Sequence, residues 1–203
     1  LFIKAPESTF VKPELLFMSI EHSLDSDDCI VAYAAFISLA RLILNQKVEQ
    51  GFMQASIEKA VLFINQYDDD ENDSIHQVID GALISMAAFF SMFPENDVVG
   101  QILPLWFKEM PITYDSPDAN IAYDLLIHFA AQKHPIILNP QSIAHLLKVY
   151  FSAIMSHQVR NEIKEFMKEH IHNLMATEET RAIIEEAFLE IDIDVRDYIK
   201  NCF

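Results

Sequence analysis

Residues 101–115 read QILPLWFKEMPITYD, an apolar segment with two prolines that runs into an acidic turn. Apolar segments with a helical pattern lie on both sides of it, and each stops at a proline, one at Phe93-Pro94 and the other at His134-Pro135. Proline ends a helix because it lacks a backbone N–H and its ring clashes with the preceding turn. Two helical units that end alike indicate a stacked helical repeat, which points to binding rather than catalysis.

The composition indicates an all-α protein with a sizeable core. Of the 203 residues, 51% are hydrophobic, which is too apolar for a disordered chain. Only 3 residues are glycine, too few for the many tight turns of an all-β protein. The two cysteines, Cys29 and Cys202, have no disulfide or metal-site spacing, and this fits a reducing intracellular setting.

The expected helices form pairs that recur at a regular spacing. Their expected bounds are 13–24, 27–45, 52–67, 74–93, 98–109, 118–134, 140–156, 159–175, 178–191 and 195–203. The second helices of four pairs begin near residues 27, 74, 118 and 159, which are 47, 44 and 41 residues apart. HEAT-type repeats have periods of about 40–47 residues, whereas tetratricopeptide repeats have about 34. The sequence therefore predicts an all-α HEAT-repeat superhelical solenoid of about five helix pairs. We expect a single array over 1–203, cut from a longer chain.

Wide apolar stripes on the expected helices support stacking, because a helix between two neighbours must bury more than one side. The stripe of 118–134 comprises Ile121, Leu125, Leu126, Phe129 and Ala130, and that of 159–175 comprises Val159, Ile163, Phe166, Met167, His170, Ile171 and Leu174. If the first pair has lost a preceding repeat, four apolar residues of its first helix are expected to be partly exposed: Leu15, Leu16, Phe17 and Ile20.

The chain is strongly acidic, with a net charge of −17 from 31 acidic and 14 basic residues. Such a chain repels nucleic acid and anionic membranes and attracts basic partners. An acidic surface that serves solubility alone remains an open alternative. The longest apolar run, 29–44, contains Arg41 and is too short to cross a bilayer, so we interpret it as a core helix and expect no membrane insertion.

A family resemblance rests on residues 74–135. The run from Asp80 through Pro94, then QILPLW and MPI followed by an acidic turn, resembles the C-terminal HEAT repeats of β-karyopherins of the importin-5 and importin-4 type. The positions that match the family pattern are Asp80, Ala82, Gln101, Leu103, Pro104, Pro111 and Asp115. Gly81 departs from the asparagine of that pattern, so a bond that the asparagine makes between repeats would be missing here.

The resemblance implies the C-terminal part of a nuclear import receptor that shuttles between cytoplasm and nucleus. Receptors of this family bind basic cargo on the inner face of a superhelix and release it when GTP-loaded Ran binds. Phe-Gly nucleoporins dock on their outer face. A HEAT-repeat scaffold of a phosphatase or chromatin complex is the alternative that the helical pattern also allows.

The densest charge cluster is the first candidate contact for basic partners. It comprises Asp68, Asp69, Asp70, Glu71 and Asp73. Like charges this close repel one another unless a cation or a basic partner lies beside them. The calcium-loop spacing of an EF-hand is absent. A solvated acidic turn is the alternative interpretation.

Further candidate contacts lie in the second helices of later pairs and in the turn before one of them. They are Asp80, Asp115, Asp118, Asn120 and Asp124. If these helices line an inner face, Asp80 and Asp124 would form charge-assisted hydrogen bonds with Lys or Arg of a ligand. The alternative is that these residues serve the turns and the neighbouring repeats.

No catalytic or metal site is expected. Three glycines are too few for a phosphate-binding loop, and neither G-x-S-x-G nor H-E-x-x-H occurs. His170 and His172 are two residues apart and do not share a helix face, so zinc would lack ligands. Cys29 is expected to be a buried thiol, and Trp106 a core residue rather than a stacking platform for a ligand. We therefore predict a non-enzymatic protein without cofactor.

Overall fold

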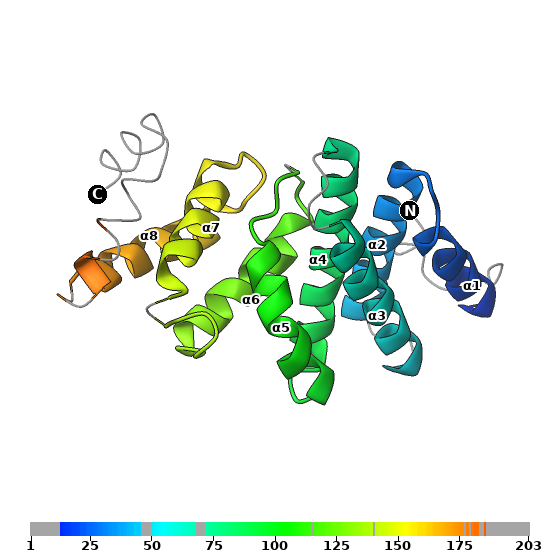
Figure 1. Ribbon diagram of the computed structural model, residues 1–203, viewed down its shortest axis with the longest axis horizontal. Helices are drawn as coiled ribbons and strands as arrows, with labels where there is room; N and C mark the ends of the chain where they lie inside the picture. The colour runs from blue at the N-terminus through cyan, green and yellow to red at the C-terminus, as the bar shows by residue number, and fades with distance from the viewer. Residues whose placement is uncertain are drawn as a thin grey trace. The chain divides into compact units, whose positions relative to one another are not determined.

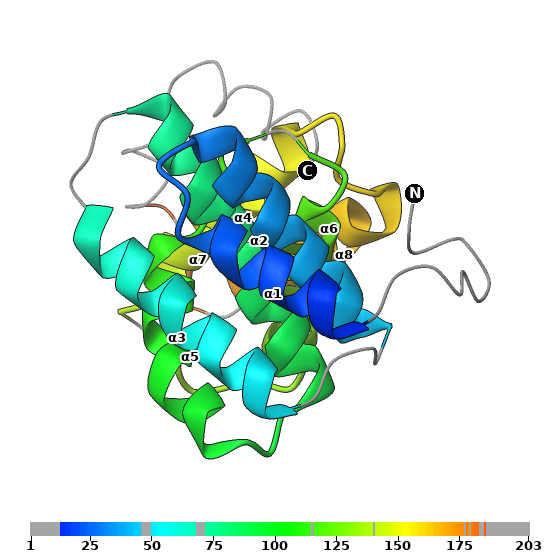
Figure 2. The same cartoon turned by 90° about the vertical axis from the view of Figure 1, so that its right-hand side faces the viewer.

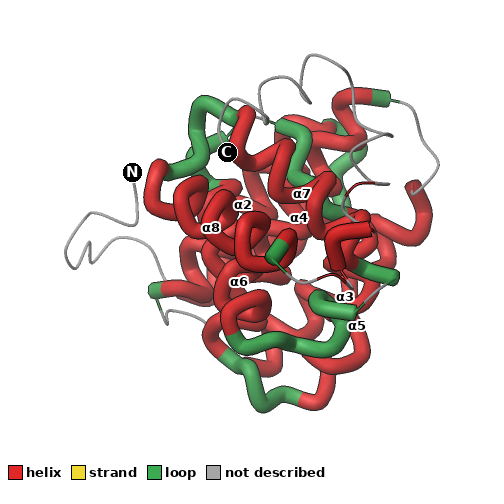
Figure 3. The backbone as a smooth tube through the Cα atoms, turned by 90° about the vertical axis from the view of Figure 1, so that its left-hand side faces the viewer, coloured by secondary structure: helices red, strands yellow, loops and turns green. Residues whose placement is uncertain are grey.

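The computed structural model describes residues 13–45, 50–67, 72–114, 116–139 and 141–176, and beyond these only 178, 180–182 and 185. Between residues 13 and 176 the described chain forms eight helices, and no strand occurs among the described residues (Figures 1 and 3). They are α1 (Pro13–Leu24), α2 (Cys29–Leu44), α3 (Gln50–Tyr67), α4 (Asp73–Met92), α5 (Asp97–Glu109), α6 (Ala119–Ala131), α7 (Ile143–Met155) and α8 (Asn161–Met175). The all-helical class is confirmed, and each helix begins and ends within three residues of its expected bounds. The helices expected at 178–191 and 195–203 lie almost wholly outside the described residues.

The end of α6 shows why one expected bound was late. Proline at 135 suggested that the helix ends at residue 134, but α6 ends at Ala131. Lys133 has a positive φ of 55°, and its N–H donates to the Ala130 carbonyl at 3.0 Å. The N–H of His134 donates to the Phe129 carbonyl at 3.0 Å, and the two rings lie 5.1 Å apart. This is a Schellman motif, which closes the helix before the proline is reached.

Two compact units make up the chain, Leu1–Ile102 and Leu103–Phe203, and their boundary falls inside α5. The single array expected over 1–203 stays a prediction.

In the first unit α1 packs against α2, α3 against α4, and α2 against α4. Helix α4 forms the centre of this core, since every residue from 78 to 90 is buried. Among the described helices, α4 alone is long and apolar enough to cross a membrane, but 72% of its apolar window is buried inside the protein. Burial by neighbouring helices explains the apolar sequence of α4 as that of a core helix.

Gly81 allows α2 and α4 to approach closely. A Cβ at this position would lie 2.9 Å from Cδ2 of Tyr33 and 3.2 Å from Cβ of Phe36. Any side chain there would therefore displace the aromatic residues of α2. Close packing of α2 on α4 therefore explains why this chain has glycine at 81 where the family pattern has asparagine.

The exposure expected on α1 is confirmed only in part. Leu15 is 58% exposed, and Leu16 and Phe17 are half-buried. Ile20 is buried, because it lies on the side of α1 that faces the rest of the first unit together with Leu24. The expectation for Ile20 was wrong because helix geometry places it about half a turn away from Leu15.

In the second unit α8 packs against both α6 and α7. The α6 stripe is buried apart from Ile121, which is half-buried. The α8 stripe buries Val159, Ile163, Met167 and Ile171 and leaves Phe166, His170 and Leu174 half-buried. Trp106 of α5 is fully buried, so the expected core role is confirmed.

Candidate protein-binding surface

Most of the acidic cluster lies outside the described residues, namely Asp68, Asp69, Asp70 and Glu71. Asp73 is described and exposed in the first turn of α4. The preceding residue, Asn72, caps this helix, since its side chain accepts from the Ser74 N–H at 2.9 Å. A carboxylate in the first turn is stabilised by the positive end of the helix dipole. Asp73 therefore has a structural role whether or not a basic partner binds.

Asp80 does not lie on an exposed face. Only 2% of it is exposed, because α4 is covered on all sides between residues 78 and 90. The expectation that Asp80 contacts Lys or Arg of a ligand on an inner face is therefore wrong. Its place in the second helix of a pair suggested an exposed inner face, but this part of α4 is buried on every side.

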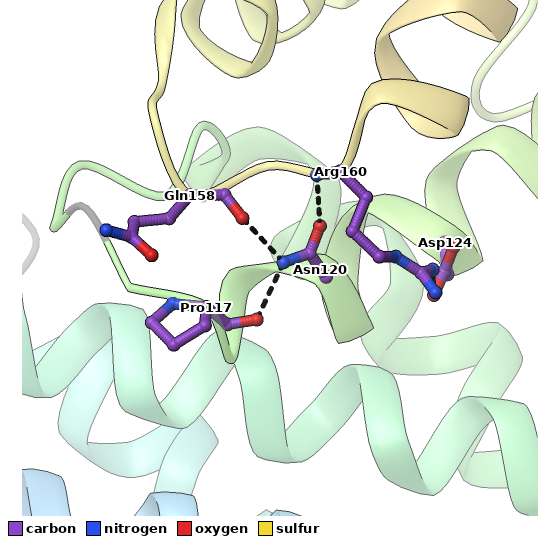
Figure 4. A network of polar contacts seen from close by, with 5 residues as sticks. All are labelled: Pro117, Asn120, Asp124, Gln158 and Arg160. Atoms are coloured by element: carbon purple, nitrogen blue, oxygen red, sulfur yellow. Dashed lines mark hydrogen bonds and ion pairs between the residues drawn. The ribbon is translucent and has the colours of Figure 1, made fainter.

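Asn120 and Asp124 join α6 to the segment that precedes α8 (Figure 4). The Asn120 amide Nδ2 donates to the carbonyls of Pro117 at 2.7 Å and Gln158 at 2.9 Å. Its Oδ1 accepts from the Arg160 N–H at 2.8 Å. The Arg160 guanidinium in turn forms an ion pair with Asp124. Both residues serve packing between helices, which is the alternative interpretation stated for them above.

Two further candidates, Asp115 and Asp118, precede α6 in the sequence. Asp118 is the N-cap residue of α6 without a side-chain cap hydrogen bond, and it is half-buried. Its N–H donates to the Ser116 hydroxyl at 3.3 Å. Asp115 lies outside the described residues, so its predicted role is untested.

A second link in the same unit joins α7 to α5. The carbonyl of Phe107 would normally accept from the residue four positions later, but that residue is Pro111, which has no N–H. His145 Nε2 lies 2.6 Å from this carbonyl and its ring packs edge-on against the Phe107 ring at 4.9 Å. Because a carbonyl only accepts, Nε2 carries the proton and donates. The Met110 N–H also donates to this carbonyl, at 3.3 Å, so His145 is a second donor to the Phe107 carbonyl.

The polar links have similar sequence separations. Lys59 of α3 pairs with Asp25 at the end of α1 at 2.6 Å, over 34 residues. The links His145–Phe107 and Asn120–Gln158 each span 38 residues, and Asn120–Arg160 spans 40. Each link joins the corresponding helices of two consecutive pairs within one unit. This is a repeat-like arrangement of helix pairs.

Sequence reasoning missed His145, Arg160 and Lys59 as members of these links. The signal that identifies them is a polar residue placed 34–40 residues away from an amide, a carboxylate or a carbonyl near a helix end. Pattern analysis of single helices does not contain that information, because the two partners belong to different repeats.

The interface between α7 and α8 contains a buried tyrosine and a histidine. The Tyr150 Oη lies 2.8 Å from Nδ1 of His170, whose ring also packs on Phe166 at 5.9 Å. Burial raises the pKa of Tyr150 above its ordinary range, so its hydroxyl stays protonated and shares a hydrogen bond with the His170 ring. Burial lowers the pKa of His170 below its ordinary value of 6.5.

Stability is expected to fall with acidification because of His170. At high pH the His170 ring is neutral in both the folded and the unfolded chain, so it does not change the free energy of unfolding. As the pH falls below about 6.5, the unfolded chain gains the proton more readily than the folded chain, so folding becomes less favourable. Urea unfolding midpoints measured from about pH 7.5 to pH 5 should therefore decline less in His170→Gln, which keeps an acceptor for Tyr150 but does not titrate. Parallel declines in the two proteins would show that His170 titrates as in the unfolded chain.

Asn120→Ala is expected to lower the free energy of unfolding by about 1–3 kcal/mol, because the Gln158 carbonyl and the Arg160 N–H lose their partner. Chemical denaturation measures the loss, and Asn173→Ala, at an exposed asparagine of α8, is the control. The control should change stability by less than about 0.5 kcal/mol. Equal effects of the two substitutions would mean that the link of Asn120 does not stabilise the fold.

No group of three His, Cys, Asp or Glu side chains suited to a metal ion occurs in the part of the chain that the structure describes. Cys29 begins α2 and is half-buried rather than fully buried.

No known protein family, curated protein or solved structure matches this chain. The resemblance to β-karyopherins therefore rests on the quoted residues alone.

Proposed function

We propose that this chain is a protein-binding segment of a nuclear import receptor built as a HEAT-repeat solenoid. The observation that carries this proposal is the spacing of the second helices, since α2, α4, α6 and α8 begin at residues 29, 73, 119 and 161, which are 44, 46 and 42 residues apart. Polar links also join corresponding helices of consecutive pairs. Stacked helix pairs of this period present extended surfaces to protein partners. The resemblance of residues 74–135 to the C-terminal repeats of β-karyopherins supports transport as the specific role.

The proposed partners are basic cargo proteins, Ran GTPase and Phe-Gly nucleoporins, and the proposed locations are the cytoplasm and the nucleus. A net charge of −17 supports attraction of basic cargo by long-range steering. The part of the acidic cluster nearest α4 is exposed at Asp73, and Asp124 is exposed beside its pair with Arg160. The mechanism involves binding and release without covalent chemistry.

A non-transport HEAT scaffold is the second candidate. It is favoured by the internal roles of Asn120 and Asp124, which remove two of the contacts assigned to cargo. Binding of Ran separates the two candidates. Selective capture of GTP-loaded over GDP-loaded Ran by the chain would support the transport receptor. Equal or absent capture of both forms by this chain and by the full-length protein that contains it would leave the scaffold.

Neutralising the acidic cluster is expected to weaken binding of a Lys/Arg-rich peptide. The variant carries Asp68→Asn, Asp69→Asn, Asp70→Asn and Asp73→Asn, and fluorescence anisotropy measures the affinity. Salt should weaken binding to the parent chain more than to this variant, since fewer charges remain to be screened. The control variant carries the same change in charge elsewhere, at exposed Glu58, Glu95, Glu162 and Glu169, each replaced by Gln. Equal affinities of the parent and the cluster variant would reduce the cluster to a solvated turn.

A further inference from the structure

The helix pair α1–α2 leaves large apolar side chains in contact with solvent. Met18 on α1 is 63% exposed and Ile30 on α2 is 73% exposed, in addition to Leu15. Scattered single exposed apolar residues are normal on a protein surface, whereas a group on adjacent helices marks an interaction site.

These residues share the outward side of the pair. On α1, Leu15 and Met18 are three residues apart and lie opposite the buried Ile20 and Leu24. On α2, Ile30 and the exposed Ala34 are four residues apart, away from the side on which Phe36 meets α4. The helices α1 and α2 pack against each other, and Figure 2 shows them side by side toward the viewer with α4 behind them. We call Leu15, Met18, Ile30 and Ala34 the hairpin face.

Negative charge borders the hairpin face at the turn between the helices. Residues 13–40 contain five carboxylates and no lysine or arginine. Asp28 caps α2, and Asp25 is paired with Lys59. Glu21 and Asp27 are exposed and form no ion pair with the residues that the structure describes. Their charge is therefore available to a partner.

The charge pattern selects among the possible occupants. A second copy of this chain would bring a net charge of −17 against the same acidic border, and an anionic membrane would be repelled likewise. The apolar residues are distributed over two helices, whose axes lie about 8–10 Å apart when packed. A third helix fits over such a pair, because its row of side chains packs into the groove between the two helices.

We propose that the hairpin face binds a basic amphipathic helix of a partner protein, with the apolar stripe of that helix on Met18 and Ile30 and its Lys or Arg residues at Glu21 and Asp27. This inference deepens the proposed function, because it rests on a basic partner and names the form in which that partner is recognised. The partner's basic end lies toward the turn between α1 and α2, where the carboxylates are.

The test uses the chain 1–203 and a labelled synthetic helix of about 18 residues with a leucine stripe and with lysines that flank the stripe at one end. Two comparison peptides have glutamate in place of lysine or a scrambled order that removes the stripe. Fluorescence anisotropy should show binding of the basic amphipathic peptide alone, with an affinity that falls as salt rises.

Matched variants locate the binding. Met18→Ser combined with Ile30→Ser should weaken it by about tenfold or more. The control is Leu62→Ser, which removes an apolar side chain that is 68% exposed on α3 and should leave affinity unchanged. Glu21→Gln combined with Asp27→Asn should lower affinity and reduce its salt dependence. Circular dichroism of each variant checks that the fold is retained.

Three results would overturn the inference. They are equal binding of the acidic peptide, unchanged binding by the variant with Met18→Ser and Ile30→Ser (the hairpin variant), and self-association of the parent chain that the hairpin variant abolishes. If binding survives in the hairpin variant but is lost when the cluster at residues 68–73 is neutralised, this inference fails while the proposed function stands. If the hairpin variant alone loses binding and Ran is not captured, the surface stands and the transport role fails.

Discussion

Trp106→Ala is expected to lower the free energy of unfolding by about 3–5 kcal/mol, the range for truncating a large buried aromatic residue. Trp106 has no exposed surface, and it is the only tryptophan of the chain. Leu103 and Phe107 of α5 and Met110 directly after it are also buried, so the substitution leaves a cavity within an apolar environment. The surrounding side chains would lose dispersion contacts that water cannot replace.

Denaturation by urea followed by circular dichroism measures this loss. Trp106→Phe is the control, since it keeps an aromatic ring and should be less destabilising than the truncation to alanine. A loss of this size is a large fraction of the about 5–15 kcal/mol that stabilises a typical domain. An alanine variant that unfolds at the same urea concentration as the parent would place Trp106 at the surface, where a ligand can reach it.

Gly81→Asn is expected to lower the free energy of unfolding by about 1–3 kcal/mol, the usual cost of overpacking. The new Cβ would lie 2.9 Å from a ring carbon of Tyr33, and a backbone-linked atom of Phe36 is only 3.2 Å away. Since Phe36 is buried and α2 is held against α4 along its length, neither side can move without disturbing the core.

Gly100 provides a matched control for this substitution. It also lies within a helix, α5, but a Cβ there would meet nothing within 4 Å. Gly100→Asn should therefore change stability by less than about 0.5 kcal/mol, as surface substitutions usually do. If the two variants unfold alike, the approach of α2 and α4 is looser than the structure indicates, and the absence of asparagine at 81 has no packing reason.

Helical periodicity predicted the eight described helices within three residues because each contains a wide apolar stripe. Proline and the acidic turns also marked most helix ends. The end of α6 was an exception, because a Schellman motif at Lys133 ends the helix before Pro135. Such a motif depends on backbone conformation rather than on the proline that follows.

The site residues were predicted less well than the helices. Asp80 and Asp124 were both expected to contact a ligand, yet Asp80 is buried at the centre of α4 and Asp124 is paired with Arg160. A stripe reveals one buried side of a helix but not how many neighbours surround it. The role of Asn120 depends on the backbone of residues 158 and 160, which is one repeat away in the sequence.

Local sequence thus determined the helical class, the helix bounds and the acidic character, because propensity, periodicity and charge act over a few residues. Tertiary structure alone decided which polar residues face solvent. Burial and hydrogen bonding depend on elements 34–48 residues apart, as with Lys59 and Asp25 or Gly81 and Tyr33. Packing between successive helix pairs therefore buried Asp80, engaged Asn120 and left Met18 and Ile30 exposed.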